Sequence, residues 1–118
     1  MLIDDDSLFT DIIGNHLARE DMPCLYAPSG AIAFDLLKKD PLPRAILLDV
    51  TMPDMDGFGV LEQIKKDPRT AAIPVVMFSN DATPENIERA KQLGAEKFIE
   101  KVEITPSDVA KLVRSLLA

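Results

Sequence analysis

Residues 45–57 read Ala-Ile-Leu-Leu-Asp-Val-Thr-Met-Pro-Asp-Met-Asp-Gly, an apolar run that ends at Asp49. Apolar residues at consecutive positions, rather than at alternate ones, are typical of a strand covered on both faces, as in a parallel sheet. Pro53 and Gly57 indicate a loop between this strand and the next helix. The segment therefore predicts a buried strand that presents a carboxylate at its carboxyl end.

Four further apolar runs occur along the chain, and segments of helical period separate them. The runs comprise residues 1–3, 24–27, 75–78 and 97–99. This alternation predicts five strand–helix units in an α/β domain, because parallel strands need a crossover connection that is usually a helix. We expect a parallel sheet with helices on both faces. The length fits one domain over residues 1–118, without an output domain.

The segments between the runs carry the patterns and signals of helices. Two apolar stripes stand out: Leu8, Phe9, Ile12, Ile13 and Leu17 near the start, and Val109, Leu112, Val113, Leu116 and Leu117 near the end. Asp6 is a suitable cap for the first of these helices, which we expect from about Ser7 to Glu20. Thr83-Pro84 and Thr105-Pro106 each place a hydroxyl before a proline, which favours a helix start. Gly94 favours a helix end.

Charge and composition exclude several classes of protein. The formal net charge of −7 disfavours binding to nucleic acid or to an acidic membrane surface, because both need Lys and Arg to meet phosphates. No apolar run is long enough to cross a bilayer, so we expect no membrane partner. Cys24 is the one cysteine, which precludes an internal disulfide and favours a reducing, cytoplasmic setting.

Polar residues follow four of the five predicted strands. They are Asp4, Asp5 and Asp6 after the first run, Asp49 after the third, Ser79, Asn80 and Asp81 after the fourth, and Glu100 and Lys101 after the fifth. Ligands of open α/β sheets bind outside the carboxyl ends of the strands, so we expect these side chains to converge at one edge. Any one acid could be a solvated loop residue or a helix cap, but the set at four strand ends favours a site.

A cluster of carboxylates at that edge calls for a positive charge. Like charges held close together raise each other's pKa, and a divalent cation relieves the repulsion. A few carboxylates with a backbone carbonyl and waters suit Mg²⁺, which also prefers phosphate as a ligand. Lys101 then has two possible partners, a carboxylate in the resting state and a phosphoryl oxygen in a modified state.

The residues around Asp49, and their spacing to the other polar positions, resemble a known family. Residues 47–57 look like the phosphorylation-site segment of response regulator receiver domains. The separations between Asp5, Asp49, Ser79 and Lys101 are similar to those of single-domain chemotaxis-type receivers. The resemblance covers essentially the whole chain. It implies a flavodoxin-like, doubly wound, five-stranded parallel sheet of order 2-1-3-4-5 with five helices.

This resemblance implies a magnesium-dependent phosphoacceptor. Asp49 would be the nucleophile that becomes an acyl phosphate, and Lys101 would pair with a phosphoryl oxygen. The ligands of Mg²⁺ would be Asp4, Asp5, Asp49 and the backbone carbonyl of Thr51. These roles fit phosphoryl transfer, which needs positioning and charge neutralisation more than covalent chemistry from the protein.

The resemblance also implies a switch. Ser79 would hydrogen-bond the phosphoryl group and move toward it, and Phe98 would turn inward as Ser79 moves. Thr51, Asn80 and Asp81 occupy positions that tune the lifetime of the phosphorylated state. The chain departs from the family at two positions: Asn80 replaces a residue that is usually very small, and Val102 replaces the usual proline after Lys101.

Partners follow from the same resemblance. The phosphoryl donor would be a sensor histidine kinase or a histidine phosphotransfer protein, and a downstream protein would bind the face of the fourth helix, fifth strand and fifth helix. Such a domain takes part in its own phosphorylation and dephosphorylation and is not a conventional enzyme. Two alternatives stay open. One is a receiver-fold binding module that is not phosphorylated, and the other is an aspartate-nucleophile phosphatase, which would normally carry a second Asp at the position of Thr51.

Overall fold

A computed structural model describes residues 1–118 and contains one five-stranded sheet of order β2-β1-β3-β4-β5. All neighbouring strands pair in parallel, which confirms the predicted α/β class and strand order. The strands are β1 (Leu2–Ile3), β2 (Tyr26–Ala27), β3 (Ile46–Asp49), β4 (Val75–Ser79) and β5 (Lys97–Glu100). Every predicted run therefore contributes a strand, although β1 and β2 are only two residues long.

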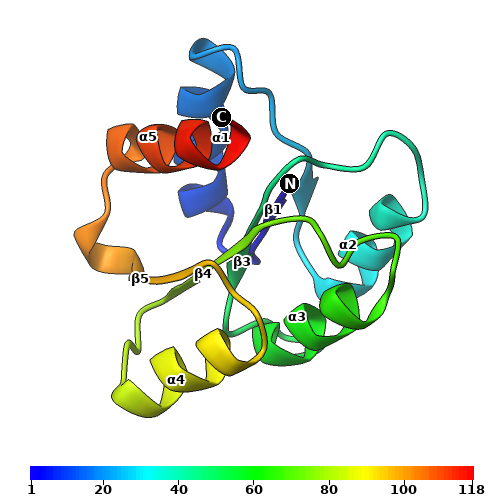
Figure 1. Cartoon of the computed structure of the whole chain (residues 1–118). Coiled ribbons are helices and arrows are strands. Elements are labelled where there is room, and N and C mark those ends of the chain that lie inside the picture. Colours follow the sequence, from blue (N-terminus) through cyan, green and yellow to red (C-terminus); the bar gives the residue numbers. More distant parts are fainter.

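Five α-helices and one short 3₁₀-helix connect these strands. They are α1 (Ser7–Arg19), α2 (Gly30–Leu37), α3 (Gly57–Lys66), α4 (Pro84–Gln92), η1 (Lys101–Glu103) and α5 (Pro106–Leu117). Helices α1 and α5 lie together on one face of the sheet, and α2, α3 and α4 cover the other (Figure 1). Two separate apolar clusters fill the two interfaces, so the sheet is doubly wound as expected.

The centre of the sheet is more deeply buried than its edges. Every residue of β3 and β4 is buried, whereas Tyr26 of β2 and Lys97 of β5 are exposed. A strand between two neighbours and two helical layers has no solvent-facing side, which explains the consecutive apolar residues of β3 and β4. The central strands therefore form a rigid base for whatever follows their carboxyl ends.

Side-chain caps fix where the helices begin. Asp6 accepts a hydrogen bond from the Phe9 N–H, and Thr83 accepts one from the Asn86 N–H. Thr105 forms a reciprocal capping box with Asp108 at the start of α5. These contacts confirm the helix starts expected at Asp6, Thr83 and Thr105.

The apolar stripe predicted for the first helix is only partly buried. Ile13 and Leu17 are buried in the α1–α5 interface, but Leu8 is 70% exposed and Ile12 is 48% exposed. Positions 9, 13 and 17 recur every four residues along the side that faces the sheet, whereas positions 8 and 12 run beside that side. Leu8 and Ile12 therefore lie on the exposed margin of the apolar stripe.

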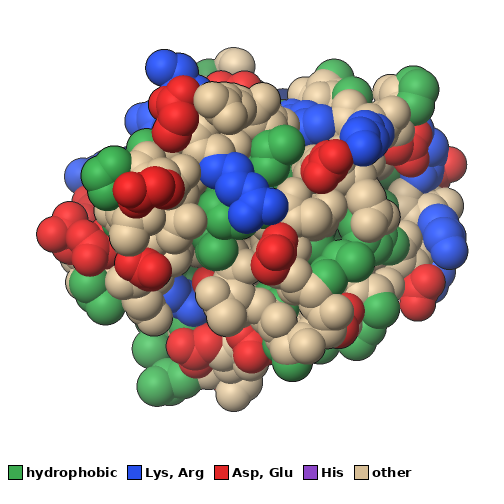
Figure 2. All heavy atoms as spheres, turned by 90° about the horizontal axis from the view of Figure 1, so that it is seen from below, with side chains coloured by type: hydrophobic (Ala, Val, Ile, Leu, Met, Phe, Trp, Pro, Cys, Tyr) green, Lys and Arg blue, Asp and Glu red, His purple; other side chains and the backbone are tan.

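The surface carries charges of both signs. Figure 2 shows acidic and basic side chains interspersed over the face seen from below, with apolar side chains in separate small groups. None of the helices is both long enough and apolar enough to span a bilayer. Three acids, Asp4, Asp5 and Asp49, nevertheless lie close together, and two of them are buried.

Candidate functional site

Four polar residues meet at the carboxyl edge of the sheet because the strand register aligns their positions. Ile3 of β1 pairs with Leu48 of β3, which places Asp4 beside Asp49. Asp49 in turn pairs with Phe78 of β4, and Ser79 pairs with Glu100 of β5. Lys101 follows directly as the first residue of η1. The edge predicted from the sequence therefore exists.

Three carboxylates lie close together at this edge. Oxygens of Asp4, Asp5 and Asp49 all lie within 4.8 Å of one another. Asp4 is only 1% exposed and Asp49 only 7% exposed, whereas Asp5 is exposed. Two buried acids that share so small a volume repel each other strongly unless a positive charge intervenes.

Burial and repulsion change the ionisation of the two inner acids. Burial, followed by the nearby charges of Asp4 and Asp5, raises the pKa of Asp49 to about 7, although Lys101 opposes the shift. Burial also raises the pKa of Asp4, against the opposing effect of Lys101. The ionised form of this cluster is therefore unfavourable in the folded protein until a cation compensates it.

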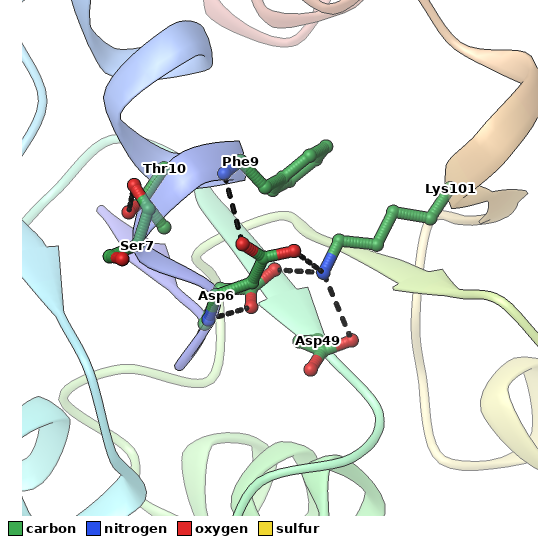
Figure 3. Close-up of polar contacts among 7 residues, drawn as sticks. Asp6, Ser7, Phe9, Thr10, Asp49 and Lys101 are labelled. Atoms are coloured by element: carbon green, nitrogen blue, oxygen red, sulfur yellow. Dashed lines mark hydrogen bonds and ion pairs between the residues drawn. The ribbon is translucent and has the colours of Figure 1, made fainter.

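Lys101 provides one positive charge within the cluster. Its ammonium Nζ lies 2.8 Å from Asp4 Oδ2, 3.8 Å from Asp6 Oδ2 and 3.9 Å from Asp49 Oδ1 (Figure 3). The side chain is only 8% exposed, so little water screens these interactions. One ammonium thus faces several acids, which leaves the site short of positive charge.

The residues present fit a divalent cation. Asp4 Oδ2 is buried, and the Lys101 ammonium at 2.8 Å is the one cation within ion-pair distance of it. Mg²⁺ binds oxygen ligands at about 2.1 Å, so two opposed ligands lie about 4.2 Å apart, which is close to the span of these carboxylates. The donor set and its spacing therefore match a small, hard cation.

The loop after Asp49 is held on both sides. The Gly57 N–H donates a 2.6 Å hydrogen bond to the Val50 carbonyl, and a Cβ at position 57 would collide with the Asp49 carbonyl. At the far side of the loop, both oxygens of Asp54 accept hydrogen bonds from α2, at 3.1 Å from the Gly30 N–H and 2.9 Å from the Ala31 N–H. These contacts fix the loop that carries the Thr51 carbonyl.

Ser79 lies at the site but makes a local contact there. Its side chain is 4% exposed, and its Oγ accepts a 2.9 Å hydrogen bond from the Asp81 N–H. Asn80 and Asp81 are exposed, and the Asn86 side-chain amide donates to the Asp81 carbonyl at 3.0 Å. The structure thus places Ser79 within the site, and Thr51, Asn80 and Asp81 at its solvent side.

Phe98 lies behind the site on the edge strand β5. It pairs with Met77 of β4, is half-buried, and packs against the apolar cluster on the α2–α3–α4 face. Val102, in η1 four residues after Phe98, is 75% exposed. Phe98 therefore lies between the apolar core and the surface.

Two residues to which the sequence analysis gave no role in the site also contact it. Asp6 is the expected helix cap, with its Oδ1 3.1 Å from the Phe9 N–H, but its other oxygen also faces Lys101. The Phe9 ring lies under the Lys101 ammonium, which is 4.4 Å from the ring centroid. The acid run at residues 4–6 could have indicated the second role of Asp6, whereas Phe9 carried no signal beyond its place in an apolar stripe.

Comparison with known proteins gives a consistent result. The family model described as the response regulator receiver domain matches residues 1–114. The two-component response regulator ORR11 of Oryza sativa subsp. indica is 32% identical over 117 residues, which cover 99% of this chain and 79% of the relative.

Solved structures agree with the sequence comparison. The signal receiver domain of a DNA binding response regulator from Colwellia psychrerythraea 34H is 30% identical, with a TM-score of 0.88 over 98% of this chain and 94% of that one. The chemotaxis protein CheY4 of Vibrio cholerae is 22% identical and has the same fold, with a TM-score of 0.88 over 98% and 94% of the two chains.

Proposed function

Because the chain belongs to the response regulator receiver domain family, we propose that Asp49 accepts a phosphoryl group and that its phosphorylation switches a protein-binding surface. The family serves signal transduction in two-component systems. The observation that carries the proposal is the position of Asp49: a buried carboxylate at the end of β3, beside two further acids and one lysine.

The acceptor chemistry follows from this geometry. A carboxylate oxygen of Asp49 attacks phosphorus in line with the leaving group. A new O–P bond forms as the P–N bond of a phosphohistidine breaks, or the P–O bond of acetyl phosphate, and the leaving group departs with the electron pair. The ammonium of Lys101 lies 3.9 Å from Asp49 Oδ1 and can form an ion pair with a phosphoryl oxygen once the phosphoryl group is bound.

Asp4, Asp5, Asp49 and the Thr51 carbonyl would hold Mg²⁺, in keeping with the acidic pocket by which the receiver family binds magnesium. When bound, the ion supplies the charge that neutralises the phosphoryl oxygens. Burial and the neighbouring acids raise the pKa of Asp49, and the charge of the ion would oppose this shift and favour the ionised carboxylate that attacks phosphorus.

The proposed switch uses residues on β4 and β5. Ser79 would release the Asp81 N–H and bond to the phosphoryl group, and Phe98 would turn into the space behind it. Helix α4 has one buried residue, Ala90, so small changes in the loop before it can shift the helix. The face formed by α4, β5 and α5 would then present the changed surface to a downstream protein. Thr51, Asn80 and Asp81 would tune the lifetime of the phosphoryl group.

The family interacts with histidine kinases or phosphotransfer proteins, and we propose one of these as the donor in the cytoplasm. The chain would take part in its own phosphorylation and dephosphorylation rather than turn over a separate substrate. Thr51, where an aspartate-nucleophile phosphatase carries its general acid, has no carboxyl group to protonate a leaving group.

Intact-mass spectrometry after incubation with Mg²⁺ and acetyl phosphate tests the proposal. Wild type should gain one phosphoryl group, and hydroxylamine should remove it because acyl phosphates are labile to this reagent. Asp49→Asn should gain none. Asp56→Asn is the matched control, because Asp56 caps α3 in the same loop and asparagine caps a helix equally well.

Other outcomes would contradict the proposal. An unmodified wild type with every donor would favour a receiver-fold binding module that is not phosphorylated. Sustained hydrolysis of phosphomonoesters would favour a phosphatase. A persistent adduct in Asp49→Asn would place the acceptor elsewhere.

A further inference from the structure

The ammonium of Lys101 lies against an aromatic ring as well as against acids. Its Nζ is 4.4 Å from the centroid of the Phe9 ring, within the distance at which a cation is attracted to the negative face of the ring. Phe9 comes from the first turn of α1, and Figure 3 shows its ring on the side of the ammonium away from Asp49. The ring therefore forms one wall of the Lys101 site.

The acids around Lys101 cannot all pair with its ammonium when a cation is bound at the site. Asp4 and Asp49 are the two acids of the proposed metal site that contact the ammonium, at 2.8 Å and 3.9 Å. A divalent cation bound by the same carboxylates competes with Lys101 for their oxygens and repels the ammonium. An aromatic ring offers no oxygen ligand to Mg²⁺, so the contact with Phe9 is not subject to this competition.

The Phe9 ring is itself held in place. It meets the ring of Phe78 edge to face, with centroids 6.0 Å apart and planes at 61°. Phe78 is 1% exposed and immediately precedes Ser79 in β4. The backbone N–H of Phe9 is fixed as well, by the hydrogen bond to Asp6 Oδ1.

We propose that Phe9 is a positioning residue that keeps the Lys101 ammonium at the acceptor site while the acids bind a cation. This inference rests on the proposed phosphoacceptor function and deepens it. Asp6 assists, because its Oδ2 lies 3.8 Å from Nζ and Asp6 is not one of the proposed ligands of Mg²⁺. Lys101 is then already in place when a phosphoryl group arrives.

The test compares variants by their affinity for fluoroberyllate, a stable mimic of the phosphoryl group, measured by titration calorimetry in saturating Mg²⁺. Phe9→Leu keeps an apolar side chain but removes the ring, and Phe9→Tyr restores a ring. Phe34→Leu is the matched control, since Phe34 is a partly buried phenylalanine of α2 on the opposite face of the sheet. Each variant is also made with Lys101→Met.

We expect Phe9→Leu to weaken fluoroberyllate binding by about 3- to 10-fold, the range of a partly desolvated cation–aromatic contact. Phe9→Tyr should recover most of the loss, and Phe34→Leu should bind as wild type does. In the Lys101→Met background, Phe9→Leu should cause no further loss, because its effect passes through the ammonium. An equal loss in both backgrounds, or no loss in either, would overturn the role of Phe9.

A second measurement tests the contact between Phe9 and Lys101 in the wild-type protein, so that it does not depend on the folding of a variant. In wild type, the Lys101 side-chain protons next to the ammonium should resonate upfield of ordinary lysine, because they lie over an aromatic ring. The shift should persist after Mg²⁺ and fluoroberyllate are added, and its disappearance on their addition would overturn the proposal.

The acceptor function of Asp49 and the positioning role of Phe9 fail separately. A wild type that takes no phosphoryl group contradicts the acceptor function, whereas a phosphorylated wild type with an unaffected Phe9→Leu contradicts only the role of Phe9.

Discussion

At the scale of single residues, Asp49 has surroundings that destabilise its ionised form in the folded protein. It is nearly fully buried, it lies beside Asp4 and Asp5, and the compensating ammonium of Lys101 is shared with other acids. Acids held this close together are short of positive charge while no cation compensates them, and that shortage destabilises the fold.

We expect Asp49→Asn to stabilise the protein in EDTA by at least about 1 kcal/mol at a pH above the raised pKa of Asp49. Because the pKa of Asp49 is raised in the folded protein, ionisation of this carboxylate lowers the free energy of unfolding. The loss grows as the pH rises from the ordinary pKa of 3.8 to about 7, and it is absent below pH 3.8. Urea unfolding at several pH values measures this difference. Asp56→Asn should show no such pH dependence, and equal stability of wild type and Asp49→Asn above neutral pH would contradict the prediction.

The sequence predicted the acids and the lysine of this site because each follows an apolar strand, and parallel strands end at one edge. It did not predict the contacts of Phe9, because a cation–aromatic contact depends on where α1 lies relative to η1, and no local pattern encodes that. Asp6 was expected at this edge, but its predicted role was that of a helix cap, which already explained an acid at that position.

At the scale of elements, α1 shows how packing distinguishes neighbouring residues of the same type. Ile12 is 48% exposed and Ile13 is 2% exposed, although both belong to the same apolar stripe in the sequence. The helical period of the apolar residues indicates that about one third of the positions face the core. The packing of the helix on the sheet then decides which of the apolar residues are buried.

This pair gives a matched prediction. Ile13→Ala should lower the free energy of unfolding by about 3 kcal/mol, because it leaves a cavity between α1 and α5. Ile12→Ala should change it by less than about 0.5 kcal/mol, because solvent fills the space. Urea denaturation of both variants measures the difference, and similar losses in the two would refute the assigned orientation of α1.

A second element-level feature is the link from the loop after β3 to the start of α2. The N–H groups of Ala31 and Gly30 hold the pKa of the Asp54 carboxyl below its ordinary value, so this link contributes at pH values above the ordinary aspartate pKa and is lost as the pH falls through the lowered one.

We expect Asp54→Ala to accelerate amide hydrogen exchange at Gly30 and Ala31, because both amides lose their acceptor. Asp54→Asn should have a smaller effect, since one amide oxygen can still accept. Hydrogen exchange followed by NMR gives the rates, with Ile32 as an internal control because its N–H donates to Ser29 Oγ instead. Unchanged exchange at Gly30 and Ala31 in Asp54→Ala would show that the link does not protect them.

At the scale of the whole molecule, one sheet separates two apolar cores and carries the site along a single edge. The alternation of strands and helices was enough to predict the class and the helical layers. The strand order came from the resemblance, because alternation alone fits several orders. The short β1 and β2 and the exposed side chains of α1 depend on long-range packing, so the local pattern could not give them.

Binding of Mg²⁺ should stabilise the whole fold. At about ten times its dissociation constant, the ion should raise the free energy of unfolding by about 1.4 kcal/mol, because it binds only the folded acid cluster. Thermal unfolding with and without EDTA measures the gain. Asp4→Asn should lose most of it, while Asp56→Asn should retain it, and an equal gain in Asp4→Asn would place the ion elsewhere.

Chemical trapping of the acyl phosphate shows directly whether Asp49 carries the phosphoryl group. Borohydride reduces an aspartyl phosphate to homoserine, so protein treated with acetyl phosphate and Mg²⁺, then reduced and digested, records the acceptor by peptide mass spectrometry. We expect homoserine at position 49 and at no other aspartate. Homoserine at Asp4, Asp5 or any other position, or none in a preparation that binds Mg²⁺, would contradict it.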